Sequence, residues 1–172
     1  MGDAPAHFFK HLILPEKFWP PTPLLDLRAL PLSALHNKEF EEIFFSTIQT
    51  FNKIQTQVFQ ALYTWNENAF IGAPTWSGGA ICTEFPLLQL WSKREQLRAV
   101  CIKPYQEMVD PRVAEWKAKL SQLQGEKEIV SLTGETSTDL RLLEKGDVIM
   151  CMPTQVRNPY VRSFDIVLIA LL

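Results

Sequence analysis

The chain has 172 residues, of which 47% are hydrophobic and 21% charged; this composition excludes a disordered, collagen-like or purely coiled-coil protein and makes one globular domain the default. Lys and Arg total 17 against 19 for Asp and Glu, so the formal charge of -2 gives no long-range field that attracts nucleic acid or a membrane surface. Any contact with phosphate must therefore be local.

Residues 1–35 predict an extended arm. Six of the twelve prolines fall in this stretch, and proline removes an amide donor and fixes φ. Five leucines between positions 24 and 32 indicate that the arm packs on a surface. We therefore expect a Pro-rich extended arm or linker over residues 1–35 and a single domain over residues 36–172.

Helical spacing of apolar residues begins after Asn37. Four stripes repeat every three or four positions, which predicts amphipathic helices. Their members are Phe40, Ile43, Phe44 and Ile48; Ile54, Val58, Leu62 and Trp65; Ile81, Phe85, Leu88 and Trp91; and Val109, Val113, Trp116, Leu120 and Leu123. Gln124-Gly125 is expected to close the fourth helix, and a shorter helix over 137–143 is expected to end at Lys145-Gly146.

Short apolar runs predict strands that alternate with these helices. The runs cover residues 69–71, 99–102, 128–132, 147–151 and 165–170. Apolar residues at consecutive positions are typical of strands with both faces covered. The alternation predicts an α/β fold with a parallel sheet flanked by helices.

The loop from Gly72 to Ala80 is the main candidate for a functional site. It follows the first expected strand and opens onto a helix near Ile81, where free amides and the helix dipole converge on an anion. A working phosphate loop also needs a lysine beside the last glycine and then Ser or Thr for magnesium. Gly79 and Ala80 stand there instead, so the cation and the metal ligand are both missing.

These residues resemble a known family. FIGAPTWSGGAICTEF is similar to FIGAPTGSGKTICAEF, the first motif of superfamily-two DExH-box RNA helicases. The likeness continues with FNKIQTQVFQALY, similar to the adenine-reading Q region, then with RAVCIKPYQEMVDPRVAEW and SLTGETSTDLRLLEKGDVIMCMPTQ, similar to later motifs. The arm resembles the segment that leads into the second helicase cassette of large spliceosomal members. The resemblance implies a partial RecA-like (P-loop) lobe.

The resemblance also implies ligands and partners. ATP and Mg are the family's cofactors, and the matching positions of a vestigial nucleotide loop are Gln55, Thr75, Ser77, Gly78 and Gly79. The positions matching RNA-backbone contacts are Pro104, Tyr105, Thr133 and Gly134. RNA and spliceosomal proteins are the implied partners, and the nucleus is the implied location.

The departures from the family weaken its chemistry in this chain. Trp76 replaces a glycine, Gly79 a lysine and Ala80 a threonine, while Leu171 and Leu172 replace the Asp-Glu pair that holds magnesium. Lysine, metal and arginine stabilise the transition-state charge of phosphoryl transfer, so we expect neither ATP hydrolysis nor unwinding by this chain alone and assign no catalytic residue.

Two prolines conflict with the expected helices. Pro86 falls inside one of them, where proline costs about 3 kcal/mol. Pro111 either interrupts the next helix or follows Asp110 as a first-turn residue.

Cysteines and histidines suggest no further site. Cys82, Cys101 and Cys151 form no CxxC pair, and the three histidines lie within the first 36 residues. We therefore expect no metal site, no disulfide partner and buried, reduced thiols. The N-terminal sequence lacks the apolar core of a signal peptide, and the apolar run 166–172 is far shorter than the ~20 residues of a membrane helix, so we expect a soluble protein without membrane contact.

Several interpretations stay open at this point. The loop over 73–80 is either a residual anion site or a connection without a ligand, and Gln55 is either an adenine reader or a polar helix residue. Thr133 and Gly134 either touch RNA phosphate or form a plain turn. The five tryptophans are either a base-stacking platform or, as the stripes through Trp65, Trp91 and Trp116 favour, core residues. Solvated faces are the expected setting of Glu84, Glu135 and Asp139.

Three functions fit these residues. The first is a degenerate piece of a spliceosome-type DExH RNA helicase without activity of its own. The second is a non-catalytic interaction module that binds splicing factors or competes with the parent helicase. The third is a chain without a function as a protein, whose apolar run IVLIALL promotes aggregation.

Overall fold

The computed structural model describes residues 25–65, 69–74, 76–93, 98–123, 125, 127–157 and the backbone of 166–170. The elements in chain order are η1 (Leu32–Leu35), α1 (Lys38–Phe45), α2 (Lys53–Phe59), η2 (Gln60–Thr64), α3 (Gly79–Cys82), α4 (Phe85–Ser92), β1 (Arg98–Ile102), α5 (Gln106–Leu120), β2 (Ile129–Ser131), α6 (Thr136–Lys145), β3 (Val148–Cys151), η3 (Gln155–Arg157) and β4 (Ile166–Ala170).

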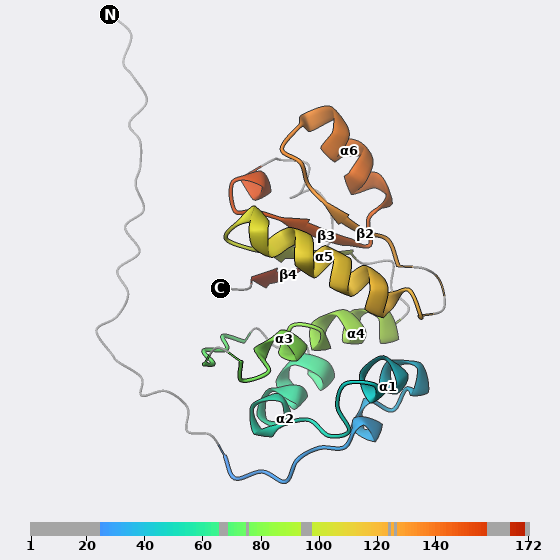
Figure 1. The fold of residues 1–172 in the computed structure, drawn as a ribbon, viewed down its shortest axis with the longest axis vertical. Coiled ribbons are helices and arrows are strands. Elements are labelled where there is room, and N and C mark those ends of the chain that lie inside the picture. The colour runs from blue at the N-terminus through green and yellow to red at the C-terminus, as the bar shows by residue number, and fades with distance from the viewer. Residues whose placement is uncertain are drawn as a thin grey trace, which may run out of the picture.

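A parallel sheet forms the middle layer (Figure 1). Its strand order is β2-β3-β1-β4, and Cys101 of β1 lies opposite Met150 of β3 and Ile169 of β4. The α5 and α6 helices lie between β1, β2 and β3 along the chain, as crossover helices do in parallel sheets. The predicted α/β architecture and four of the five predicted strands are confirmed.

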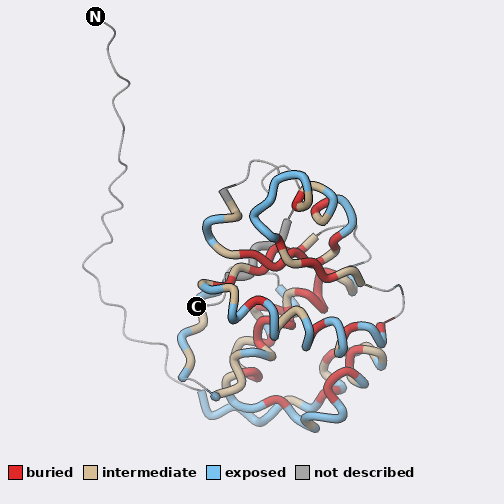
Figure 2. The backbone as a smooth tube through the Cα atoms, turned by 45° about the horizontal axis from the view of Figure 1, so that its top comes forward, coloured by how far each residue is buried: buried red, intermediate tan, exposed pale blue. Residues whose placement is uncertain are grey.

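The alternation of side chains along the strands divides the core into two parts. Ala99 and Cys101 belong to a large cluster that includes Trp116 of α5, whereas Val100 packs with Leu143 of α6. Figure 1 shows the corresponding layers, with α6 on one face of the sheet and α5 on the other, and Figure 2 shows that β1, β2 and β3 are mostly buried. Both faces of the sheet are therefore covered, which explains its consecutive apolar residues.

Aromatic rings hold the N-terminal helices together. Phe51 lies edge-on to Phe44 of α1 and to Phe85 of α4, with ring centroids 5.9 and 5.1 Å apart. Phe59 of α2 packs on Phe85 at 5.2 Å. Such pairs contribute about 0.5–1.5 kcal/mol beyond the burial of their area. This cluster joins α2 to α4, between which the candidate nucleotide loop lies in the sequence.

The predicted strand over residues 69–71 does not form. Residues 69–74 have no regular secondary structure, and the Phe70 side chain is 88% exposed. A strand is stabilised by its hydrogen-bonded neighbours, and none of the four strands in the described sheet pairs with this segment. The apolar run alone was an insufficient signal.

The two prolines of the predicted helices have different outcomes in the structure. The expected helix over 81–91 is divided into α3 and α4, which places Pro86 in the first turn of α4, where the cost of proline is avoided. Pro111, in contrast, lies inside the continuous helix α5, which begins after Tyr105 and ends at Leu120, before Gly125. Neither alternative proposed for Pro111 is correct.

Other parts of the sequence prediction have mixed outcomes. Of the arm, residues 1–24 lie outside the described residues; in the described part Leu25 and Leu27 are exposed, whereas Leu32 is buried in η1. Trp116 is buried as predicted, but Trp65 caps the end of η2 and is 57% exposed, so its placement in the core was wrong. Residues 137–143 form part of α6, which ends before Gly146 as predicted.

Candidate functional site

Two side chains at the start of α2 hold the candidate nucleotide loop. Asn52 and Gln55 cap this helix reciprocally: each backbone N–H donates to the other's side-chain oxygen at 2.9 Å. Their amide nitrogens remain to bond elsewhere. Asn52 Nδ2 donates to the Ser77 carbonyl at 2.8 Å and Gln55 Nε2 to the Gly78 carbonyl at 3.1 Å. The cap of one helix thus fastens the loop that enters α3.

Gly78 is required by this contact. Its φ of +88° lies in the left-handed region, and it serves as the N-cap of α3. A Cβ at this position would lie 2.5 Å from Gln55 Nε2 and 2.6 Å from Asn52 Nδ2. Glycine therefore allows the loop backbone to approach the two amides closely.

Trp76 occupies a second left-handed position of the same loop. The Ser77 N–H donates to the Pro74 carbonyl at 3.1 Å, which closes a turn with Trp76 at its third position. Trp76 has a φ of +67°, a conformation that turns normally assign to glycine, and its side chain is 99% exposed. The backbone here has the conformation of a glycine loop, but an indole projects from it.

The end of the loop has open space but no charged side chain. A Cβ on Gly79 would meet no atom within 4 Å, and Ala80 is exposed. Helix α3 has only four residues, so few peptide dipoles align there. Thr75, the remaining predicted residue of this loop, lies outside the described residues, as do Leu171 and Leu172.

The structure brings Gln55, Ser77 and Gly78 together, as the resemblance implies. Gln55 is only 3% exposed, its oxygen accepts from Asn52, and its nitrogen donates to the loop. The described contacts therefore use this side chain as a brace between α2 and the loop. Sequence reasoning did not find Asn52, although its position three residues before Gln55 matches a capping box.

The four residues matched to RNA contacts lie at one edge of the sheet. Pro104 and Tyr105 follow β1, and Thr133 and Gly134 follow β2. Because β1 and β2 flank β3 in a parallel sheet, both loops leave at the carboxyl edge. Tyr105 is exposed as the N-cap of α5.

Asp139, which was expected on a solvated face, is a buried carboxylate that holds the loop after β2 in place. Asp139 Oδ1 accepts from the Thr133 N–H at 2.7 Å and from its hydroxyl at 2.9 Å, and Oδ2 accepts from the Gly134 N–H at 3.0 Å. The Thr133 hydroxyl also accepts from the Glu135 N–H at 3.2 Å. The N–H groups of Thr133 and Gly134 and the Thr133 hydroxyl therefore already donate hydrogen bonds within the loop. The expectation of a solvated Asp139 was wrong, whereas Glu135 is exposed.

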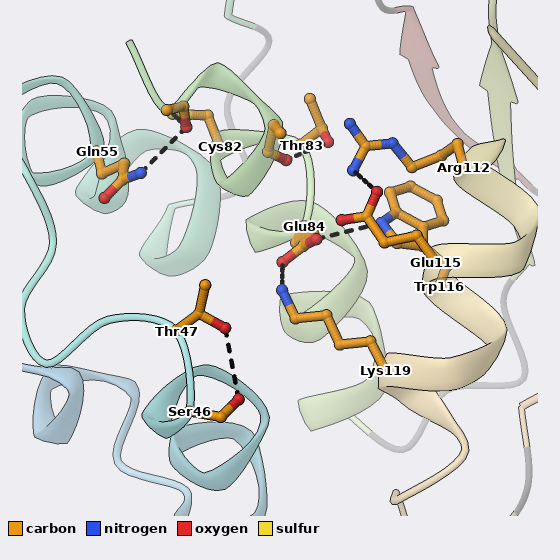
Figure 3. A network of polar contacts seen from close by, with 12 residues as sticks. Ser46, Thr47, Gln55, Cys82, Thr83, Glu84, Arg112, Glu115, Trp116 and Lys119 are labelled. Atoms are coloured by element: carbon orange, nitrogen blue, oxygen red, sulfur yellow. Dashed lines mark hydrogen bonds and ion pairs between the residues drawn. The ribbon is translucent and has the colours of Figure 1, made fainter. Parts of the chain in front are cut away.

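Glu84 is the second acidic residue whose predicted exposure was wrong. It is buried where α4 begins, accepting from Trp116 Nε1 at 3.2 Å and from Lys119 Nζ at 2.5 Å (Figure 3). Lys119 Nζ also lies 4.2 Å from the centre of the Phe44 ring. Burial raises the pKa of Glu84, and the Lys119 charge partly opposes that change. The network ties α4, α5 and α1 together and has a structural role.

The three cysteines are buried, as predicted, and their thiols are free. Burial raises the pKa of Cys82 and Cys101 to about 11 and that of Cys151 to about 12. Since the thiolate is the reactive form, these thiols are unreactive near neutral pH. In the described part of the chain, no three His, Cys, Asp or Glu side chains gather as a metal site. None of its helices combines the length and apolarity needed to cross a bilayer.

Comparison with known proteins agrees with these features. The family model for "DEAD/DEAH box helicase" matches residues 52–168. The chain is 49% identical over 147 residues to "Pre-mRNA-splicing factor brr2" of Schizosaccharomyces pombe and 48% identical over 145 residues to the human "U5 small nuclear ribonucleoprotein 200 kDa helicase". These matches cover 86% and 84% of the chain, which spans 7% of the length of either relative.

A plant relative and a solved structure extend the likeness. "DExH-box ATP-dependent RNA helicase DExH12" of Arabidopsis thaliana is 44% identical over 147 residues, or 84% of this chain and 7% of that protein. The crystal structure of the DUF1998 helicase MrfA bound to DNA and AMPPNP superposes with a TM-score of 0.68 at 14% identity, over 83% of this chain and 22% of that one. At this identity the structural match supports the fold, a partial RecA-like α/β lobe.

Proposed function

The chain belongs to the DEAD/DEAH box helicase family, and from this premise we propose that it is a portion of a helicase ATP-binding lobe that has lost ATPase and unwinding activity of its own. The observation that carries the proposal is the loop from Trp76 to Ala80. It keeps the left-handed backbone of a glycine loop and its brace to Gln55, but it has no lysine at position 79 and no hydroxyl at position 80.

The residues of this loop do not fit magnesium nucleotide. A Cβ at position 79 would meet no atom within 4 Å, so a side chain can start there, yet glycine offers no cation to the phosphates. Ala80 has no oxygen to ligate magnesium, and the Gln55 amide is already bonded within the protein. We therefore derive no catalytic step through ATP, and the residual anion site becomes the less favoured interpretation of the loop.

Restoring the family residues provides a sharp test. We expect no phosphate release by the natural chain in the presence of RNA, ATP and magnesium above a heat-treated control. The triple variant Trp76→Gly, Gly79→Lys, Ala80→Thr should gain affinity for ATP without unfolding, since the space beside Gly79 is open. Turnover of ATP by the natural chain would contradict the proposal.

A second candidate function is a non-catalytic module that binds proteins. The observation in its favour is that the helical core remains complete while the nucleotide loop has lost its chemistry: Phe44, Phe51 and Phe85 interlock, and Trp116 is fully buried. The spliceosomal relatives point to splicing factors as partners, to RNA as a further one, and to the nucleus as the location. Recovery of no splicing factor from nuclear extract by the immobilised chain would count against this candidate.

A further inference from the structure

A groove of about 880 Å³ lies away from the nucleotide loop. It is bounded by residues 27–30, η1 and the neighbouring His36 and Asn37, one side of α2 and η2, and the C-terminal end of α4. Figure 1 shows these elements at the end of the molecule opposite α6. Neither Asn52, Gln55 nor Gly78 lines the groove, so it is distinct from the site described above.

The charged side chains of the groove have one sign. Arg28 and Lys93 line it, and the described part of the lining contains no aspartate or glutamate. Among the described residues, neither the Arg28 nor the Lys93 side chain has an ion-pair or hydrogen-bond partner; the ion pairs there involve Lys53, Arg112, Lys119 and Lys145. Two unpaired cations beside one concave surface favour an anionic partner.

The polar groups of the groove match a peptide backbone. Three carboxamides line it: Asn37, Gln60 and Gln89. Gln89 is 4% exposed, and its buried Nε2 has no hydrogen-bond partner among the described residues. A carboxamide offers a donor and an acceptor together, as a peptide group does. The Asn37 oxygen already accepts from the Phe40 N–H at 3.3 Å, so its nitrogen remains for an extended chain, whereas Gln60 offers both groups.

The apolar residues of the groove can contact apolar side chains at every second position of an extended peptide. Leu30, Leu35 and Phe59 provide an apolar surface, and the Tyr63 hydroxyl already donates to the Leu35 carbonyl at 2.7 Å. The volume falls in the range of small-molecule sites, but such sites enclose most of their ligand. Here the two cations are themselves exposed, which favours an elongated ligand that lies along the surface.

We propose that this groove binds an extended acidic peptide segment of a partner protein. The peptide's carboxylates pair with Arg28 and Lys93, its backbone pairs with the carboxamides, and its apolar side chains contact Leu30 and Phe59. The proposal specifies the partner chemistry of the second candidate function and is independent of the ATP proposal, because no residue of the nucleotide loop takes part.

Fluorescence anisotropy with a labelled eight-residue peptide of alternating glutamate and leucine tests the proposal on the full chain without nucleotide. We expect saturable binding that weakens with added salt, and no binding of the charge-reversed peptide of alternating lysine and leucine. The double variant Arg28→Glu, Lys93→Glu should weaken binding about tenfold. The matched control Lys117→Glu, Arg141→Glu makes the same charge change at exposed positions of α5 and α6 and should retain the natural affinity.

Three outcomes would overturn the proposal: no binding of the acidic peptide, equal binding of the basic peptide, or equal weakening by both double variants. The uncharged variant Gln89→Leu separates the role of the carboxamide from that of charge and should weaken binding about fivefold. Unchanged affinity of a folded Gln89→Leu chain would contradict the proposed pairing of Gln89 with the peptide backbone. Amide chemical-shift changes should cluster on Thr56, Gln60 and Thr64; a cluster on α6 would place the peptide elsewhere and contradict the assignment.

Discussion

At the scale of single residues, two neighbouring glycines have opposite requirements. Gly78 has a positive φ and two amide nitrogens within 2.6 Å of a Cβ position, whereas Gly79 has open space. We predict that Gly78→Ala lowers the free energy of unfolding by about 2–4 kcal/mol, through backbone strain and loss of the Asn52 and Gln55 contacts. Gly79→Ala should be neutral or stabilise by up to about 0.5 kcal/mol. Urea unfolding measures both, and equal effects would contradict the role assigned to the brace.

Trp76 stores strain in the same loop. A non-glycine residue in the left-handed region costs about 1–2 kcal/mol, part of which glycine loses again through its greater unfolded-state entropy. We predict that Trp76→Gly raises the free energy of unfolding by about 1 kcal/mol. Trp76→Ala removes the indole but keeps the strained backbone and should give no gain. A similar gain from both variants would assign the effect to the indole.

Glu84 links stability to pH. Its pKa in the folded chain is raised above the ordinary value of 4.5, so the unfolded chain releases this proton first as the pH rises. The contribution of Glu84 to stability is therefore fully present below about pH 4.5 and is lost as the pH rises through the folded-state pKa. The difference in unfolding free energy between the natural chain and Glu84→Gln should fall from pH 4 towards pH 8. A difference that grows with pH would reverse the assignment.

The sequence indicated some residues that lie together in the fold, but it misjudged the environment of two carboxylates. It matched Gln55, Ser77 and Gly78 to one loop, and the structure brings them together. It missed the burial of Glu84 and Asp139, because each carboxylate is stabilised by donors whose positions only the fold determines: Trp116 and Lys119 for Glu84, Thr133 and Gly134 for Asp139.

At the scale of elements, proline position decides the cost to a helix. Pro111 lies in the interior of α5, where it removes a hydrogen bond to the preceding turn, while Pro86 lies in the first turn of α4, where that bond does not exist. We predict that Pro111→Ala raises the free energy of unfolding by about 2 kcal/mol. Pro86→Ala should be neutral or lower it by up to about 1 kcal/mol. Thermal unfolding of the two variants checks the contrast, which equal shifts would refute.

Apolar periodicity predicted the strands of the sheet correctly, but it wrongly predicted a strand in a segment that does not pair with the sheet. The strands from β1 to β4 were predicted within one residue at each end, and the apolar runs of β1, β2 and β3 are buried in the two core clusters that include residues of α5 and α6. Residues 69–71 carry the same kind of run but pair with no described strand, and Phe70 is exposed. Strand formation depends on a neighbour, which a local pattern does not contain.

At the scale of the whole molecule, a complete core coexists with an altered ligand loop. Helices cover both faces of the sheet, and the aromatic cluster joins α1, α2 and α4. The free energy of folding comes mainly from such burial, whereas nucleotide affinity depends on a few charged groups at one loop. The loss of ATPase chemistry that we propose for Gly79 and Ala80 is therefore compatible with the family fold.

The most direct test of this account is the thermal unfolding of the purified chain with and without magnesium-ATP. A ligand that binds the folded state stabilises it by RT ln(1 + [L]/Kd), about 2.7 kcal/mol at a hundredfold excess over Kd. We predict one cooperative transition with the same Tm in both conditions, and an upward shift for the variant Trp76→Gly, Gly79→Lys, Ala80→Thr. A clear upward shift for the natural chain would show that its loop still binds nucleotide and would contradict the central claim.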